Sequence, residues 1–305
     1  MCSASKEGLN LAEEFREKHA LGNEPIADIA DFMQLVDADF MILDLPDNVD
    51  ALALRDPVTG ATVIGIAKSS VPYRQRFTVA HEIGHFISSD FESSKIVEDD
   101  GRSEPGIYVC GKRDHQEVRA DTFARNVLCP TDGLKSDHKL SELTSSGDIL
   151  AALSHVVRRY QISPQVALIQ MRHAGLISEE QSEELKGISA PALAARYGWK
   201  ADYDRAVKVS GLVQPSARLV KDTYRAYERG IVDLPSIAFA EMSSVDEVKE
   251  LISASQSQLP PLAHGANVQD QDVVDVEPDP FAELDAFFGD ASDKSNSSDS
   301  SESTQ

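Results

Sequence analysis

The segment Arg74-Gln-Arg-Phe-Thr-Val-Ala-His-Glu-Ile-Gly-His-Phe86 is the most informative part of the sequence. Its apolar residues recur at helical spacing and predict a helix over about 74–89. Because positions four apart share one face of a helix, His81 and His85 can bind one metal ion together. Glu82 lies about 100° further round the helix axis, where it can take a proton from water without being a ligand. This pattern is typical of a zinc site that carries out hydrolysis.

The third metal ligand is expected from the next predicted helix, at about 115–128. A catalytic zinc usually has three protein ligands and one water, so two histidines leave the site incomplete. The helix contains Glu117-Val-Arg-Ala-Asp121, and its two carboxylates share one face because they are four residues apart. One can bind the metal while the other accepts the ring N–H of a ligand histidine. His115 is the alternative ligand, although its spacing places it on a different face. Transition-state stabilisation is left open between His115, Tyr73 and Tyr108.

The segments around the motif predict an α+β domain. Residues 39–45 have the pattern of a strand, and residues 51–55 and 61–67 flank a turn-rich link, as in a β-hairpin. Residues 11–36 predict two helices before this small sheet. Residues 90–111 are charged and interrupted by Gly and Pro, so they are expected to form an exposed excursion.

Helical additions are predicted after residue 130. A polar link at 131–146 leads to amphipathic helices at 149–160 and 164–173, and helical segments continue to about residue 252. The two helices have the spacing of a helix-turn-helix unit, but core packing is the favoured role. The side chains that such a unit would offer to DNA bases are Gln165, Gln170 and Arg172.

The end of the chain is predicted to be a disordered acidic tail over residues 255–305. It holds eleven acidic residues and one Lys, and its Ser-rich end has no apolar side chain to bury. One apolar island interrupts it, in which Phe281, Leu284 and Phe288 share one face of a short predicted helix. Such a helix is typical of a segment that folds into the groove of a partner protein.

Composition excludes several classes of protein. The 305 residues include 51 acidic and 29 basic residues, for a formal charge of −22, so neither nucleic acid nor an anionic membrane is expected as a partner. No apolar run is long enough to span a bilayer, and the first residues lack the pattern of a signal peptide. Three scattered cysteines do not make a disulfide framework. A cytoplasmic protein is expected, with Cys129 as a buried thiol.

Two segments together resemble the signatures of the ImmA/IrrE family of metallopeptidases. One is Arg74–Phe86, and the other is Glu117-Val-Arg-Ala-Asp-Thr-Phe-Ala-Arg-Asn-Val-Leu-Cys-Pro130. The resemblance covers about residues 10–175 and, more loosely, 176–252. It implies a zincin-like metallopeptidase domain at residues 1–135, followed by a helical region at 145–252 and the tail.

The resemblance also implies the residue roles and the activity. His81, His85 and Glu117 match the metal ligands, with zinc as the metal, and Glu82 matches the catalytic carboxylate, while Asp121 is left to orient a ligand histidine. The implied function is a zinc-dependent endopeptidase that cleaves a protein regulator, namely a helix-turn-helix repressor. The alternative is a non-catalytic module that sequesters a repressor or binds DNA through residues 148–175. Glu82 favours the enzyme, because a purely structural metal site has no use for a general base.

Overall fold

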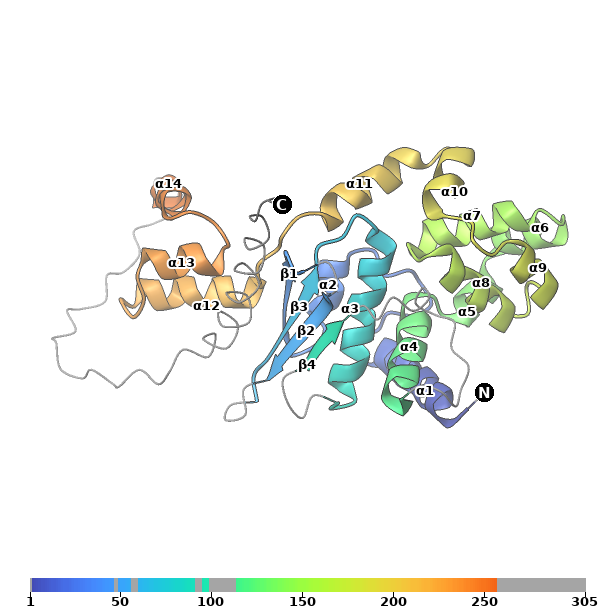
Figure 1. The fold of residues 1–305 in the computed structure, drawn as a ribbon, viewed down its shortest axis with the longest axis horizontal. Coiled ribbons are helices and arrows are strands. Elements are labelled where there is room, and N and C mark those ends of the chain that lie inside the picture. Colours follow the sequence, from blue (N-terminus) through green and yellow to red (C-terminus); the bar gives the residue numbers. More distant parts are fainter. Residues whose placement is uncertain (1, 47–48, 56–59, 91–94, 99–113, 257–305) are drawn as a thin grey trace, which may run out of the picture. The chain divides into compact units, whose positions relative to one another are not determined.

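The computed structural model describes residues 2–46, 49–55, 60–90, 95–98 and 114–256 (Figure 1). The strands are β1 (Asp39–Leu43), β2 (Val49–Arg55), β3 (Thr62–Ala67) and β4 (Lys95–Glu98). The helices are α1 (Ser3–Lys18), α2 (Ile29–Met33), α3 (Pro72–Ile87), α4 (His115–Leu128), α5 (Thr131–Ser136), α6 (His138–Ser145), α7 (Ile149–Tyr160), α8 (Pro164–His173), α9 (Glu179–Glu184), α10 (Ala190–Arg196), α11 (Lys200–Ser210), α12 (Ala217–Glu228), α13 (Leu234–Ala240) and α14 (Val245–Gln256). The predicted α+β class is confirmed.

The four strands form one mixed sheet in the order β1-β3-β2-β4. β2 and β3 are antiparallel, with Ala51 opposite Ile66, so the predicted hairpin is confirmed. β1 pairs with β3 in parallel, with Asp39 opposite Val63. β4 pairs with β2 and lies inside the segment that was expected to be an exposed excursion. That expectation was wrong at β4, because a strand of four residues is too short to show an alternating pattern.

Helix α3 packs against the sheet, and α4 packs between α3 and α1 (Figure 1). Two glycines permit these close helix contacts. A Cβ atom on Gly84 of α3 would lie 3.0 Å from a ring carbon of Phe123 and 3.2 Å from the Cα atom of Ala120. A Cβ atom on Gly8 of α1 would lie 2.3 Å from the carbonyl oxygen of Arg119. The glycine inside the histidine motif therefore allows α4 to approach the face of α3 that carries the histidines.

Helix α1 begins at Ser3, earlier than the helix predicted within residues 11–36. Its buried positions include Ala4, Gly8 and Ala12. Small residues give a weak hydrophobic period even where they face a neighbouring helix, so the sequence pattern concealed the first two turns. The close packing against α4 explains why this face needs small side chains.

Two other segments also differ from the prediction. The second predicted helix is only α2, which begins after the cap residue Asp28, whose carboxylate accepts the amide hydrogen of Ala30 at 2.8 Å. The prediction of a polar link at 131–146 was wrong, because helices α5 and α6 occupy this segment. One apolar side chain in each, Leu134 and Leu140, is buried, and these single anchors are too few to produce a helical period.

Helices α7 and α8 have the predicted bounds, and α8 packs on α4. Gln170 was one of three candidates for contact with DNA bases, but its side chain is fully buried. Its Nε2 donates to the carbonyl oxygen of Cys129 at 2.6 Å, just after α4. Arg172 is exposed and pairs with Glu179 at 3.4 Å. The assignment of Gln170 as a base-reading residue was therefore wrong, and the core-packing role fits this helix.

One hydrophobic core cluster extends from Ala12 to Tyr203 and includes residues on both sides of the predicted division between 135 and 145. A second, small cluster is formed by Ile237, Ala238 and Val248 of α13 and α14. The division into a peptidase domain and a helical region stays a prediction. Cys129 is buried, and burial raises the pKa of its thiol, as expected for an unreactive cysteine.

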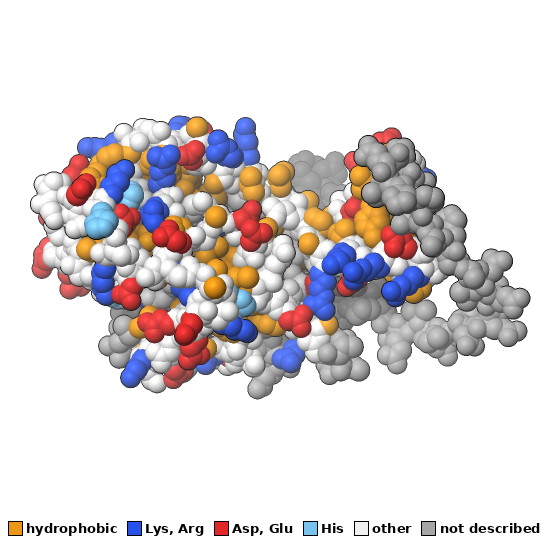
Figure 2. Space-filling view, turned by 180° about the vertical axis from the view of Figure 1, so that it is seen from behind, with side chains coloured by type: hydrophobic (Ala, Val, Ile, Leu, Met, Phe, Trp, Pro, Cys, Tyr) orange, Lys and Arg blue, Asp and Glu red, His pale blue; other side chains and the backbone are white. Residues whose placement is uncertain are grey.

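Several predictions fall on residues outside the described part of the chain. The tail prediction largely concerns residues 257–305, and the island with Phe281, Leu284 and Phe288 lies there too. Among the described residues, no helix combines the length and the apolar character needed to cross a bilayer. On the face shown in Figure 2, Lys and Arg side chains stand beside Asp and Glu over the described surface. That nucleic acid is not a partner stays a prediction.

Candidate metal centre

Three side chains from α3 and α4 converge on one point. The Nε2 atoms of His81 and His85 lie 3.0 Å apart. The Glu117 carboxylate places one oxygen 3.4 Å from His81 Nε2 and the other 3.4 Å from His85 Nε2. One donor atom from each residue lies within 4.8 Å of the others. The structure thus brings together the three residues that the sequence predicts as metal ligands.

The outer nitrogen of each histidine ring is held by a carboxylate. His81 Nδ1 lies 2.9 Å from an oxygen of Asp121, and His85 Nδ1 lies 2.9 Å from an oxygen of Asp90. A carboxylate accepts a hydrogen bond, so each Nδ1 carries a proton and each Nε2 faces the other donor atoms. Once both Nε2 atoms are deprotonated, two lone pairs and the Glu117 carboxylate face one another, an arrangement that a bound cation would stabilise. Two imidazoles and one carboxylate are a donor set that suits zinc.

The pKa shifts in this cluster have the same cause. Burial alone would lower the pKa of His81, but hydrogen bonds to Asp121 and Glu117 outweigh it and raise the pKa to about 10. Burial alone would raise the pKa of Glu117, but hydrogen bonds to His81 and His85 hold it well below its usual range. The cluster therefore stabilises positive charge between the histidines and negative charge on the carboxylate. In the metal-free protein the positive charge is a proton on His81, and a metal ion would displace it from Nε2.

Glu82 lies on α3 directly after His81, and its side chain is buried, with 1% exposed. Its negative charge is one of the causes that raise the pKa of His81, so the two groups interact electrostatically. A carboxylate screened from bulk water beside a metal site is in a suitable position to accept a proton. His115, the alternative ligand, instead lies on the exposed side of α4, with its Nε2 3.4 Å from a carboxylate oxygen of Glu7.

Asp90 is a residue of this site that sequence reasoning missed. It was placed in the exposed excursion, but its side chain is only 6% exposed and contacts His85 and Arg119. The chain reverses at Ser89, which has a left-handed backbone with φ of 57°. Such a helix end usually carries Gly, which would have been a sequence signal. Because Ser stands at that position, the sequence contains no signal for the turn that brings Asp90 back to the helix.

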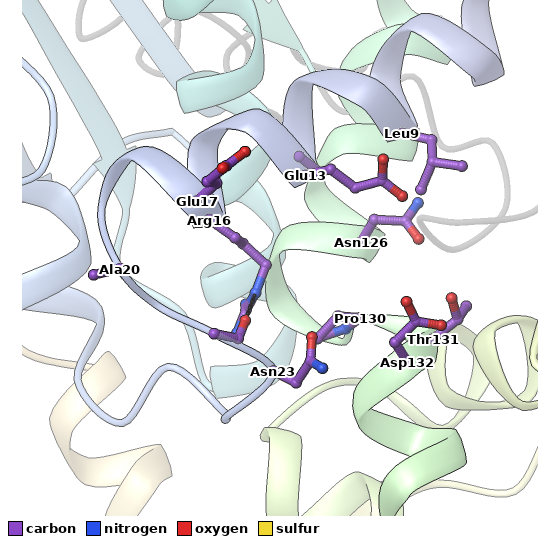
Figure 3. A pocket seen from close by; sticks show the side chains of 12 residues that line it. Leu9, Glu13, Arg16, Glu17, Ala20, Asn23, Asn126, Pro130, Thr131 and Asp132 are labelled. Atoms are coloured by element: carbon purple, nitrogen blue, oxygen red, sulfur yellow. Dashed lines mark hydrogen bonds between the residues drawn. The ribbon is translucent and has the colours of Figure 1, made fainter.

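A cavity of about 470 Å³ lies elsewhere, along α1 and the end of α4 (Figure 3). None of the three converging side chains lines it. Arg16 does, and it is 5% exposed. Its guanidinium donates to the carbonyl oxygens of Gly22, Glu24 and Val127, and so joins the loop after α1 to the last turn of α4.

Comparison with known proteins agrees with this geometry. No curated protein matches the chain. The family model for peptidase M78, described as IrrE N-terminal-like domain, matches residues 37–172. The match begins before β1, includes α3 and α4 with the converging side chains, and ends in α8. Residues 37–172 therefore match the IrrE N-terminal-like peptidase domain, as the two signature segments predicted.

Proposed function

We propose that this protein is a zinc-dependent endopeptidase that cleaves a protein regulator, specifically a helix-turn-helix transcriptional repressor. The observation that carries the proposal is the convergence of His81, His85 and Glu117 beside the buried carboxylate of Glu82, within a peptidase-family domain. In this proposal the domain is of the zincin type. The repressor substrate rests on the resemblance to the ImmA/IrrE family, and it would place the reaction in the cytoplasm.

His81, His85 and Glu117 would hold the zinc. Bound zinc acts as a Lewis acid and lowers the pKa of water, which supplies a nucleophile at neutral pH. Glu82 takes a proton from the attacking water and returns it to the leaving nitrogen of the scissile peptide. Asp121 and Asp90 keep the histidine rings in the Nδ1–H tautomer.

The proposal is tested by Glu82→Gln, which keeps the size of the side chain but removes the proton acceptor. Zinc content should stay near one per chain, because Glu82 is not one of the converging ligands. Cleavage of a co-expressed repressor should fall by about 10²–10⁴-fold, the usual contribution of general acid–base catalysis. Mass spectrometry of the products would identify the cleaved bond in the wild-type reaction.

Glu142→Gln is the matched control, since Glu142 is an exposed acid on α6 and should leave both zinc content and cleavage unchanged. The non-catalytic alternative makes a different prediction. If the protein only sequesters a repressor, Glu82→Gln regulates as well as the wild type does. Wild-type activity of Glu82→Gln with zinc still bound would therefore overturn the peptidase proposal.

A further inference from the structure

A chain of charged contacts leads from the histidine cluster to helix α1. His85 Nδ1 lies 2.9 Å from one oxygen of Asp90, and the other oxygen of Asp90 accepts a hydrogen bond from Arg119 Nη2. Arg119 Nη1 lies 3.9 Å from a carboxylate oxygen of Glu7 on α1. The four side chains come from α1, α3, α4 and the turn after α3. They connect elements that are far apart in the sequence.

The inner part of this chain is buried. The side chain of His85 is 1% exposed, that of Asp90 is 6% exposed and that of Arg119 is 16% exposed. A buried carboxylate is costly unless it is paired and hydrogen-bonded, and Asp90 has a partner on each oxygen. Its charge is therefore stabilised at the place where it accepts the ring proton of His85. Asp121 has the same relation to His81, so each proposed ligand histidine has its own carboxylate.

The backbone also fixes Asp90 to His85. The amide of Asp90 donates to the carbonyl oxygen of His85 at 3.1 Å, and the amide of Ser89 donates to that of Phe86 at 3.0 Å. These two bonds, with Ser89 in the left-handed region, make a Schellman turn that ends α3. Asp90 thus contacts His85 through both backbone and side chain, and its carboxylate has little freedom to point elsewhere.

Helix α1 supports the outer end of the chain of contacts. Gly8 follows Glu7 and lies so close to α4 that a Cβ atom would be 2.3 Å from the carbonyl oxygen of Arg119. This contact fixes the distance between Glu7 and Arg119. Helix α1 precedes residue 37, where the family match begins, so a helix outside the matched domain reaches its metal site.

We propose that Asp90 is a positioning residue for metal binding, held in place by Arg119, with Glu7 of α1 supporting Arg119. Asp90 keeps His85 in the Nδ1–H tautomer and fixes the direction of its Nε2 lone pair. The inference rests on the proposed metal site. It adds that the affinity of the site depends on a carboxylate after α3 and on a helix that lies outside the matched domain.

The test measures Co²⁺ binding, since Co²⁺ commonly occupies zinc sites and its visible absorption spectrum depends on ligand geometry. The variants are Asp90→Asn, Arg119→Gln and the double variant, with affinities obtained by chelator competition. Asp90→Asn should weaken binding by about 10–100-fold, as expected for loss of an outer partner of a ligand histidine, and should alter the spectrum. Arg119→Gln should weaken binding less. Because Arg119 acts through Asp90, the double variant should match Asp90→Asn alone.

Glu7→Gln should weaken binding by a few-fold, and Glu13→Gln is its matched control. Glu13 is an exposed acid on the same helix and lies outside the chain of contacts, so that variant should bind Co²⁺ as the wild type does. If Asp90→Asn fails to fold, Arg119→Lys, which keeps the charge, is compared with Arg119→Gln. Near-normal Co²⁺ binding by Arg119→Lys, together with weaker binding by Arg119→Gln, would support the role of Asp90.

Two results separate this inference from the proposed function. If the wild type binds neither Co²⁺ nor zinc, both the metal site and the role of Asp90 are wrong. If the wild type binds Co²⁺ and Asp90→Asn has the same affinity and spectrum, only the role of Asp90 is wrong. Equal loss in Arg119→Lys and Arg119→Gln also overturns it, because charge at position 119 would then be irrelevant.

Discussion

Replacing Gly8 by Ala tests whether the close contact between α1 and α4 is necessary. In an exposed helix, Gly→Ala stabilises a protein by about 0.5–1 kcal/mol, because Ala loses less backbone entropy on folding. At Gly8 the added methyl group would lie 2.3 Å from the carbonyl oxygen of Arg119, 2.9 Å from the Cβ atom of Thr122 and 3.0 Å from the amide nitrogen of Phe123. Two of these atoms belong to the backbone of α4, so the clash cannot be relieved by a side-chain rotation.

The helices must therefore separate, and the sign of the effect should reverse. Overpacking a close contact costs about 1–3 kcal/mol, which exceeds the gain in helix propensity. The net loss in free energy of unfolding is then about 0.5–2 kcal/mol. At about 2–4 °C per kcal/mol for a domain of this size, the melting temperature should fall by about 1–8 °C.

Differential scanning calorimetry of the full chain measures this change. Asn10→Ala is the control, because Asn10 is exposed on the same helix and gains only propensity, so its melting temperature should rise slightly. Co²⁺ affinity should also fall in Gly8→Ala, since Arg119 moves with its backbone. A melting temperature above that of the wild type would show that α1 does not press against α4 at this position.

The remaining predictions concern the cluster of His81, His85 and Glu117 itself. Glu117→Ala should lose most of its zinc and His115→Ala should retain it, as measured by elemental analysis, because only Glu117 lies with the two histidines; the opposite result would reverse the ligand assignment. Metal-free protein should become less stable as pH rises from about 6.5 to about 10, since the folded state holds the His81 proton that the unfolded state releases near pH 6.5. Thermal unfolding across this range should show the decline, and His81→Ala should flatten it.

The parts of the fold that the sequence predicted are those with a strong local signal. Helices α3, α4, α7 and α8 carry apolar residues at helical spacing, and the β2–β3 hairpin has alternating segments around a turn-rich link. The proposed ligands His81, His85 and Glu117 belong to two such helices, so their spacing alone placed each on a defined face. Local periodicity was sufficient because each helix is stabilised by one continuous buried face.

What the sequence concealed depends on contacts between distant segments. Asp90 reaches the cluster through a left-handed turn at Ser89. Ser rarely adopts this conformation, so its presence in the sequence does not indicate such a turn. From the sequence, Gln170 is expected to be a polar surface residue. In the structure α8 packs on the end of α4, and the side-chain amide of Gln170 donates to backbone carbonyl oxygens there. Arg119 can pair with Glu7 only because α1 packs close to α4. The small buried residues of α1 permit that packing, and they give no recognisable pattern in the sequence. No single segment contains this information.

The hydrogen bonds of the Arg16 guanidinium restrict which substitutions relatives of this protein can accept. The Arg16 side chain donates hydrogen bonds to carbonyl oxygens in the loop after α1 and in the last turn of α4. The backbone hydrogen bonding of both segments therefore depends on one residue. A relative that replaces this Arg must supply other donors to those oxygens or bring water to them, because unsatisfied buried carbonyls are costly. Substitutions at position 16 should therefore coincide with changes in the loop at 21–24 or around residue 127. An alignment of relatives would show those positions changing together.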